Sequence, residues 1–309
     1  MENFLKKTHQ KKNRNNFLGN IVAIVTPMKQ DGNIDKVSLK KIIEYHIREK
    51  TNSIVIFGTT GEFSKITRKE YLETIFSAVE YSDNKIPIIV GNNSISTEEA
   101  ILTNKLVQCS KISGCLINSP ISQTILSQEE LYIHFKKIAE SSEDSQILLY
   151  NVPSRTKQNL SPSTISRLSE IDNIIGIKET SPDLKRMLKI KEVVNEDFII
   201  LSGNDLNFFD FMLAGADGVI SVVANIAANL VFEICYSIRL GKIRKAKKIY
   251  SNLKPLIIKL SYSINPIPIK FACHKIGLIR SNYSRIEFRK DKKFKKFQKS
   301  LENFLLNFF

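Results

Sequence analysis

The chain has few of the residues that mark disulfide-rich, metal-binding or membrane proteins. Its 309 residues contain no tryptophan, four cysteines and four histidines. The cysteines show neither a CxxC spacing nor a regular framework, which indicates reduced thiols in a cytosolic protein. The histidines form no HxxxH or HxxE pair, so we expect no metal site.

Long apolar runs are also missing. No apolar run approaches the 18 residues that a membrane-spanning helix needs, and residues 1–20 contain no hydrophobic core followed by a cleavage site. The sequence therefore predicts a soluble, cytoplasmic protein that is not secreted and does not bind a membrane.

Positive charge is abundant but unevenly distributed. The net charge is +15, and ten of these charges fall within residues 1–20 and 281–300. The body between them is nearly balanced, so we expect two solvated basic ends and no specific nucleic-acid partner, with weak non-specific binding of polyanions as the alternative. Residues 1–18, rich in lysine and asparagine, are expected to form a disordered extension.

Short β-branched apolar runs recur along the chain, separated by segments of helical periodicity. They are continuously apolar, which is typical of a parallel sheet covered on both faces. Eight such units predict a TIM (β/α)8 barrel over residues 19–225, with no linker dividing the chain. The predicted strands are residues 21–26, 54–57, 86–90, 114–117, 147–150, 174–178, 198–202 and 218–221.

The remaining segments read as helices. Thr67, Ser96 and Ser127 each precede a Glu by three residues, which predicts three capping boxes. Residues 226–309 form an additional helical region expected to pack on the barrel, with helices at 226–240, 242–262, 268–276 and 293–308.

Lys178 ends the sixth predicted strand, directly after a buried apolar run. Because burial disfavours the charged form of an amine, a lysine there can present a free amine that attacks a carbonyl. Tyr150 ends the fifth strand, one βα unit earlier. Since neighbouring strands of a barrel lie about 4.8 Å apart, the phenol and the amine share one rim, where the phenol can shuttle protons.

Two further motifs follow strand ends on the same rim. Thr59 and Thr60 lie in a GTTG turn after strand two, whose hydroxyl and backbone N–H donors fit a small carboxylate. Arg155 follows Tyr150 by five residues and can bind a second carboxylate bidentately. Each residue alone also fits an ordinary structural role, as a solvated lysine, a core tyrosine, a plain turn or a surface arginine. Together they indicate Schiff-base chemistry on a keto acid.

The segments GTTGE at 58–62, YNVPSRT at 150–156 and IIGIKE at 174–179 resemble the motifs of the dihydrodipicolinate synthase and N-acetylneuraminate lyase family. The resemblance extends from about residue 19 to residue 279. The double threonine and the Ser-Arg-Thr after Asn-Val-Pro are similar to the synthase branch, whose members condense pyruvate with aspartate semialdehyde for lysine and diaminopimelate synthesis.

Carried over to this chain, the resemblance implies that Lys178 forms a Schiff base with pyruvate and that no other cofactor is used. Tyr150 would be the proton donor and acceptor, in a relay with Thr59. The remaining implied substrate-binding residues are Thr60 for the pyruvate carboxylate, Arg155 for the aldehyde's carboxylate, and Gly203 and Ile220 for the pyruvate pocket. A homotetramer, built as a dimer of dimers, is also implied.

The chain departs from the family after strand four. Where the family has Pro-Tyr-Tyr, this sequence has Pro120-Ile121-Ser122, so the relay tyrosine supplied by a neighbouring subunit is missing at its matched position. Lysine-sensitive members bind lysine in a polar interface pocket beside these tyrosines. The matching positions are Phe63, Ser64, Arg68, Tyr71, Ile95, Glu99 and Ile121, of which only Glu99 keeps the family's character.

Three interpretations follow. The first is a class I aldolase-type lyase that condenses pyruvate with L-aspartate 4-semialdehyde. The second is another pyruvate-dependent aldolase of the same family, such as N-acetylneuraminate lyase. The third is a catalytically impaired barrel kept for a binding role, which Ser122 alone favours.

Overall fold

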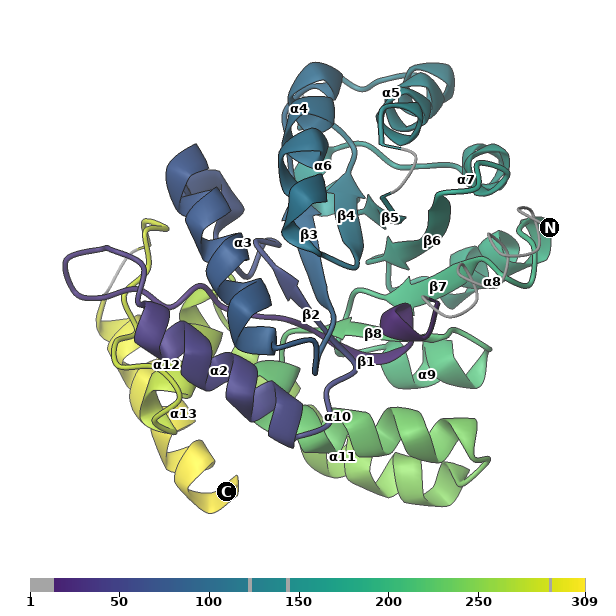
Figure 1. The fold of residues 1–309 in the computed structure, drawn as a ribbon. Coiled ribbons are helices and arrows are strands. Elements are labelled where there is room, and N and C mark those ends of the chain that lie inside the picture. Colours follow the sequence, from purple (N-terminus) through teal and green to yellow (C-terminus); the bar gives the residue numbers. More distant parts are fainter. Residues whose placement is uncertain (1–13, 122–123, 143–144, 289–290, 309) are drawn as a thin grey trace.

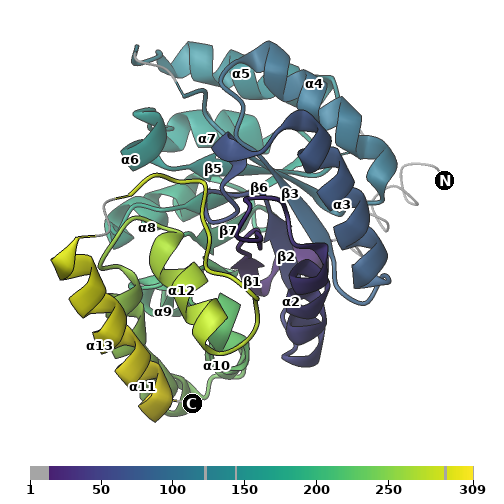
Figure 2. The same cartoon turned by 90° about the vertical axis from the view of Figure 1, so that its left-hand side faces the viewer.

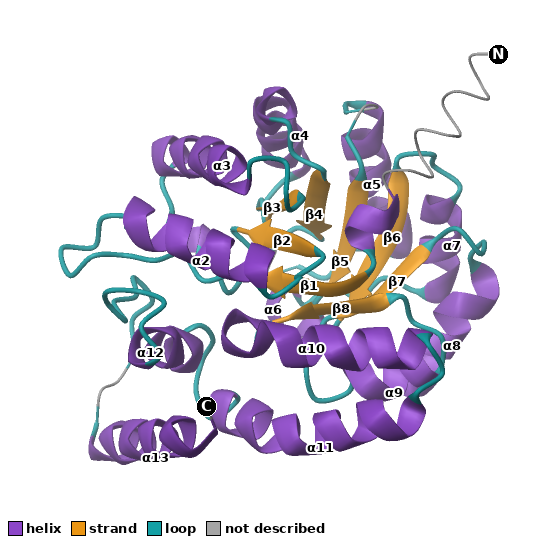
Figure 3. Cartoon of the chain, turned by 60° about the horizontal axis from the view of Figure 1, so that its bottom comes forward, coloured by secondary structure: helices purple, strands orange, loops and turns teal. Residues whose placement is uncertain are grey.

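The structure, a computed structural model, describes residues 14–121, 124–142, 145–288 and 291–308. Eight parallel strands form a closed barrel in the order β1 to β8, and β8 pairs with β1. Helices surround the barrel (Figures 1 and 3). The predicted (β/α)8 barrel is confirmed.

Every strand of the barrel is buried, and nearly every residue within each strand is buried as well. This explains the continuously apolar runs, because both faces of the sheet are covered. The strands are β1 Gly19–Ala23, β2 Ser53–Ile56, β3 Ile88–Asn92, β4 Gly114–Asn118, β5 Ile147–Asn151, β6 Ile174–Glu179, β7 Ile199–Ser202 and β8 Gly218–Ser221.

Two strands begin two residues away from their predicted positions, and the other strands agree within one residue. β1 begins and ends earlier than the predicted residues 21–26. Residues 24 and 25 are buried like the strand residues, but they lie beyond the end of the strand. β3 begins at Ile88 rather than at residue 86. Pro87 lacks an N–H donor, and it contributes only its carbonyl, which accepts a 2.9 Å hydrogen bond from Ile54 N.

The helices between the strands begin largely where the capping residues predict. The capping boxes at Thr67 and Ser127 are present. At Ser96 only half forms, because the Glu99 carboxylate accepts from Ile95 N instead of from the cap residue. The helices are α2 Lys36–Arg48, α3 Arg68–Ser82, α4 Thr97–Val107, α5 Gln128–Glu140, α6 Pro153–Thr156, α7 Pro162–Ser169, α8 Leu184–Val193 and α9 Phe208–Leu213.

The apolar side chains divide into two clusters. One fills the space between the strands and the surrounding helices. The other fills the barrel interior and contains one or more residues from most of the strands, together with Phe17, Tyr150 and Val152. The barrel is therefore a packed core with its chemistry at one end, rather than a pore.

Residues 14–18, which the sequence assigns to a disordered extension, are structured. Residues Asn15–Phe17 form a 3-10 helix, and Phe17 is fully buried in the interior cluster. Arg14 donates 2.8 Å and 2.9 Å hydrogen bonds to Asp197 and to the carbonyl of Glu196. The expected extension therefore does not include these residues.

The C-terminal region adds helices outside the barrel. Helix α10, Ala224–Arg239, packs on β1 and β8, so the predicted boundary at residue 226 falls inside the eighth helix of the barrel. The additional helices are α11 Ile243–Leu260, α12 Ile267–Lys275 and α13 Lys292–Phe308. They lie together on one side of the barrel (Figure 2). There α13 buries Phe294, Phe297, Leu301 and Leu305. Within the described residues, no helix is both long and apolar enough to span a membrane.

Candidate active site

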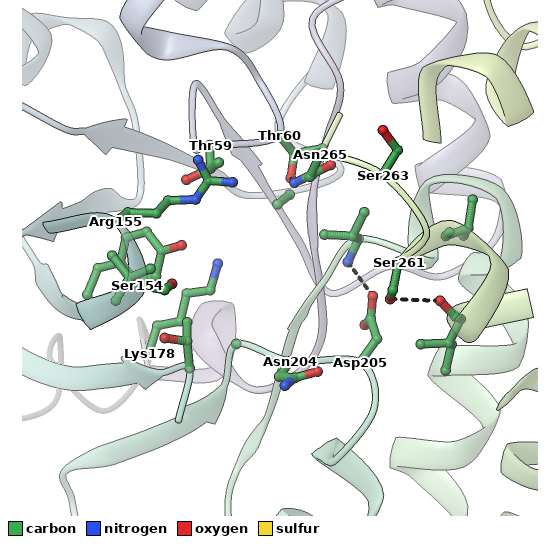
Figure 4. Close-up of a pocket in the computed structure, with 18 residues that line it drawn as sticks. Thr59, Thr60, Ser154, Arg155, Lys178, Asn204, Asp205, Ser261, Ser263 and Asn265 are labelled. Atoms are coloured by element: carbon green, nitrogen blue, oxygen red, sulfur yellow. Dashed lines mark hydrogen bonds between the residues drawn. The ribbon is translucent and has the colours of Figure 1, made fainter. Parts of the chain in front are cut away.

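A cavity of about 270 Å³ opens at the carboxyl ends of the strands (Figure 4). Barrel enzymes place their chemistry at this end. Six of the seven residues singled out in the sequence line the cavity, and they come from four different strand ends: Thr59, Thr60, Tyr150, Arg155, Lys178 and Gly203.

Lys178 and Tyr150 are direct register partners on β6 and β5. The Lys178 amine lies 4.4 Å from the centre of the Tyr150 ring. The side chains are 7% and 5% exposed, respectively, so both are nearly enclosed. The prediction that consecutive strands bring the amine and the phenol to one rim is confirmed.

The alternation of side chains along β6 directs Lys178 inward. Its neighbours Ile177 and Glu179 point to the other side of the sheet. Glu179 is fully buried there, and it accepts hydrogen bonds of 2.9 Å and 3.1 Å from Asn151 and a 3.0 Å hydrogen bond from Arg186. Because the Glu179 carboxylate is already paired on the other side of the sheet, it does not pair with the Lys178 amine, which faces the cavity.

Gly203 provides the space that the Lys178 stem occupies. A Cβ placed on Gly203 would lie 2.8 Å from Cε and 3.1 Å from Cγ of Lys178. Its φ is not in the left-handed region, so the requirement here is close approach and not backbone conformation. The glycine after strand seven is therefore needed for the position of the amine.

The turn that carries Thr59 and Thr60 is held from several directions. Gly61 N donates to Gly58 O at 3.0 Å, and the Thr26 hydroxyl donates to Gly61 O at 2.7 Å. A Cβ on Gly61 would lie 2.8 Å from the backbone nitrogen of Phe57, so only glycine fits. Thr60 is 2% exposed, whereas Thr59 is half-buried.

Arg155 lies on α6, directly after β5, and its side chain is exposed. Among the described residues, no carboxylate pairs with its guanidinium, and Figure 4 shows the group extending toward Thr59. An exposed guanidinium that pairs with no carboxylate of the described residues, at the mouth of a cavity, can take a ligand carboxylate in a bidentate geometry.

Asp205 adds a carboxylate to the cavity that the sequence reasoning missed. It accepts hydrogen bonds from Val222 N at 3.0 Å and Val223 N at 2.8 Å, and burial raises its pKa. The sequence did offer a signal for this residue, because Asp205 lies two residues after Gly203, just beyond the end of strand seven.

Asn265 was also missed as a site residue. Its side-chain amide donates a 2.9 Å hydrogen bond to the Thr60 hydroxyl, and it lines the cavity with Ser261 and Ser263. All three residues follow the barrel in sequence, after α11. Because they do not lie at a strand end, the strand pattern gives no signal for them.

Two expectations are not met at the positions predicted. Ile220 packs in the barrel interior, and Val222 lines the cavity in its place. Among the described residues, no hydrogen bond joins the hydroxyls of Thr59 and Tyr150, although both residues line the cavity. The departure at Ser122 lies outside the described residues.

The described residues contain no group of three histidine, cysteine or acidic side chains arranged to hold a metal ion. The polar groups around the cavity are instead an amine, a phenol, a guanidinium, one carboxylate, hydroxyls and amides.

The family model of the dihydrodipicolinate synthetase family matches residues 16–303, nearly the whole chain. The chain belongs to this family. Its sequence is 46% identical over 293 residues to the 4-hydroxy-tetrahydrodipicolinate synthase of Buchnera aphidicola subsp. Cinara cedri, a match that covers 94% of this chain and 98% of the relative.

Solved members of the dihydrodipicolinate synthetase family have the same fold. The dihydrodipicolinate synthase from Aquifex aeolicus matches with a TM-score of 0.90 at 33% identity, covering 94% of this chain and 98% of that one. The enzyme from Acinetobacter baumannii, solved in complex with pyruvate, matches with a TM-score of 0.88 at 37% identity and covers 93% and 98% of the two chains.

Proposed function

We propose that this chain catalyses the condensation of pyruvate with L-aspartate 4-semialdehyde to 4-hydroxy-tetrahydrodipicolinate, in lysine and diaminopimelate biosynthesis. The observation that carries the proposal is the nearly enclosed Lys178 amine, 4.4 Å from the Tyr150 ring, in a cavity lined by carboxylate-binding groups. Membership of the dihydrodipicolinate synthetase family and the names of the relatives support it.

Lys178 is the nucleophile in this proposal. Its amine adds to the carbonyl carbon of pyruvate, and loss of one water gives the Schiff base, so no further cofactor is needed. Tyr150 donates the proton that the departing hydroxyl requires and later takes a proton back. The family resemblance and its place in the same cavity as Tyr150 support a part for Thr59 in this relay, and Thr60 with the adjoining backbone N–H groups holds the pyruvate carboxylate.

The second substrate binds at the mouth of the cavity. Arg155 takes the carboxylate of aspartate semialdehyde, because its guanidinium is exposed and is not paired with any carboxylate of the described residues. Gly203 shapes the pyruvate pocket by leaving room for the Lys178 stem.

We further propose that the enzyme is a cytoplasmic homotetramer, a dimer of dimers. Ile95, Ile121 and Ile125 are 66%, 46% and 75% exposed, which supports burial of this region against a second copy. Sedimentation equilibrium at micromolar protein tests this proposal, since a single species of monomer mass would contradict it.

Borohydride reduction in the presence of pyruvate tests the chemistry. Pyruvate should become bound irreversibly to one peptide, containing Lys178, and Lys178→Ala should abolish the label. Lys185→Ala is the matched control, because Lys185 is an exposed lysine just after the same strand. Pyruvate-dependent labelling of a different lysine would contradict the assignment.

Acceptor profiling tests the substrate. With pyruvate saturating, aspartate semialdehyde should be turned over with a much higher kcat/KM than N-acetylmannosamine, the acceptor of N-acetylneuraminate lyase. The reverse preference would assign the chain to the other branch of the family.

A further inference from the structure

A buried ion pair lies behind the turn that carries Thr59 and Thr60. Lys270, on α12, pairs with Glu62, and both side chains are completely buried. The Lys270 amine also donates to Tyr283 O at 2.8 Å. The other Glu62 oxygen accepts from the Ser284 hydroxyl at 2.9 Å and from Arg285 N at 2.8 Å.

Such a pair is a poor device for stability alone. Burying two charges costs several kcal/mol per ion, and a pair of this kind is often replaced by apolar residues without loss. Burial lowers the pKa of Lys270, which reflects this cost. Lys270 does not line the cavity, so it is not a second nucleophile for the substrate.

The conformation of the turn explains what the pair does. Glu62 ends the turn with a φ of 58°, and Phe57 begins it with a φ of 55°. Residues other than glycine hold this left-handed conformation at a cost of about 1–3 kcal/mol, and they do so only where their surroundings impose it. The Glu62 side chain, fixed by α12 and by residues 283–285, imposes it at this end of the turn.

The same C-terminal segment contacts the turn at a second point. Asn265, two residues before α12, donates its 2.9 Å hydrogen bond to the Thr60 hydroxyl. Thr60 lies two residues before Glu62, so both contacts act on one short loop. Figure 4 shows Asn265 beside Thr60 at the edge of the cavity.

From this arrangement we infer that Lys270 is a positioning residue for the substrate carboxylate, acting through Glu62 on Thr59 and Thr60. The inference rests on the proposed function, in which this turn binds the carboxylate of pyruvate. Lys270 touches neither substrate, and it sets the geometry of the groups that do.

The test uses the full chain with Lys270→Met, which keeps an apolar stem of similar length and removes the amine. Two quantities are measured: the pyruvate concentration that gives half-maximal borohydride trapping, and the KM values for pyruvate and for aspartate semialdehyde. We expect the pyruvate values to rise about tenfold or more and the KM for the aldehyde to change less than about twofold. Lys275→Met is the control, because Lys275 lies on the same helix in an exposed pair with Glu302.

A second variant guards against loss of the fold, since Lys270→Met leaves Glu62 buried without its partner. Glu62→Gln combined with Lys270→Met removes both charges and still breaks the link from α12 to the turn. We expect the same pyruvate-specific rise from this double variant, with a circular dichroism spectrum and an elution volume like those of the unmutated chain.

Three results would overturn the inference. They are unchanged pyruvate values in a folded variant, an equal rise in the KM values of both substrates, and pyruvate-dependent labelling of Lys270 itself. If the unmutated chain were not trapped by pyruvate at all, the proposed function would fail and this inference with it. That result is distinct, because it would be seen before any variant is compared.

Discussion

A side chain at position 203 would occupy the space of Lys178, since a Cβ on Gly203 would lie 2.8 Å from Lys178 Cε and 2.6 Å from Thr180 Cγ2. Gly203→Ala should therefore displace the amine and lower kcat/KM by about 10- to 100-fold, because small displacements of a reacting group cost this much. Steady-state kinetics measure the loss, and thermal unfolding gives the control. A variant with normal kinetics would show that Lys178 can shift without consequence.

Arg155→Ala should raise the KM for aspartate semialdehyde and leave the KM for pyruvate nearly unchanged. Losing one charge-assisted contact costs about 1.5–3 kcal/mol, which corresponds to roughly 10- to 150-fold in affinity. Arg167→Ala is the matched control, because Arg167 is a surface arginine paired with Glu129. Equal changes in both KM values would contradict the assigned role.

L-Lysine should not inhibit this enzyme. At the positions that match the family's lysine pocket, Ile95 and Ile121 are exposed apolar side chains, and the Glu99 carboxylate already accepts from Ile95 N at 2.9 Å. The Tyr71 hydroxyl donates to Gly91 O at 3.1 Å and is buried against Phe63. These positions therefore offer a cationic amino acid few free partners, and each unmet polar group costs about 1–3 kcal/mol.

Initial rates measured with increasing L-lysine test this prediction. The rate should stay constant up to at least about 1 mM L-lysine. A dissociation constant of that size corresponds to a binding free energy of only about −4 kcal/mol. Half-inhibition below that concentration would show that lysine binds through other groups.

Glu70 should make stability depend on pH in acid. Its hydrogen bond and ion pair with Arg285 lower the pKa of the Glu70 carboxyl from 4.5 to about 2. A lowered pKa stabilises the folded state above the unfolded value, and this contribution is lost as the pH falls from about 4.5 to about 2. Glu70→Gln should therefore cost about 1–2 kcal/mol at pH 7, less than the pKa shift alone would give because solvent screens this partly exposed pair, and progressively less toward pH 2.

Urea unfolding at several pH values measures this contribution. Glu73→Gln is the control, because Glu73 lies on the same helix with about half of its side chain exposed, and we expect it to shift stability only slightly at any pH. A cost for Glu70→Gln that does not depend on pH would assign its role to the helix cap at Thr67 instead.

The parts of the site that lie at strand ends could be predicted from the sequence. Continuous apolar runs locate the strands, and the order of the strands then places Tyr150 beside Lys178 without any knowledge of their contacts. Ile220 came from the family resemblance and not from this pattern, and it packs in the barrel interior without lining the cavity. Val222, two residues further along the chain, reaches the cavity.

The parts that depend on pairing between distant segments could not be predicted. Asn265 and Thr60 are separated by 205 residues, and Lys270 and Glu62 by 208. Neither pair follows a helical or strand periodicity. A lysine inside a short apolar helix also gives no sign that its partner is a glutamate in a turn on the barrel rim.

The distance in sequence between Glu62 and Lys270 has a consequence for the chain while it is being synthesised. At about 5–20 residues per second, the ribosome adds the 208 residues between them in roughly 10–40 s. Throughout that time the threonine turn lacks its contacts with Asn265 and Lys270, even after the strand carrying Lys178 has emerged. A nascent or truncated chain therefore has the amine before all the contacts of the carboxylate-binding turn exist, and we expect it to bind pyruvate less tightly than the completed protein.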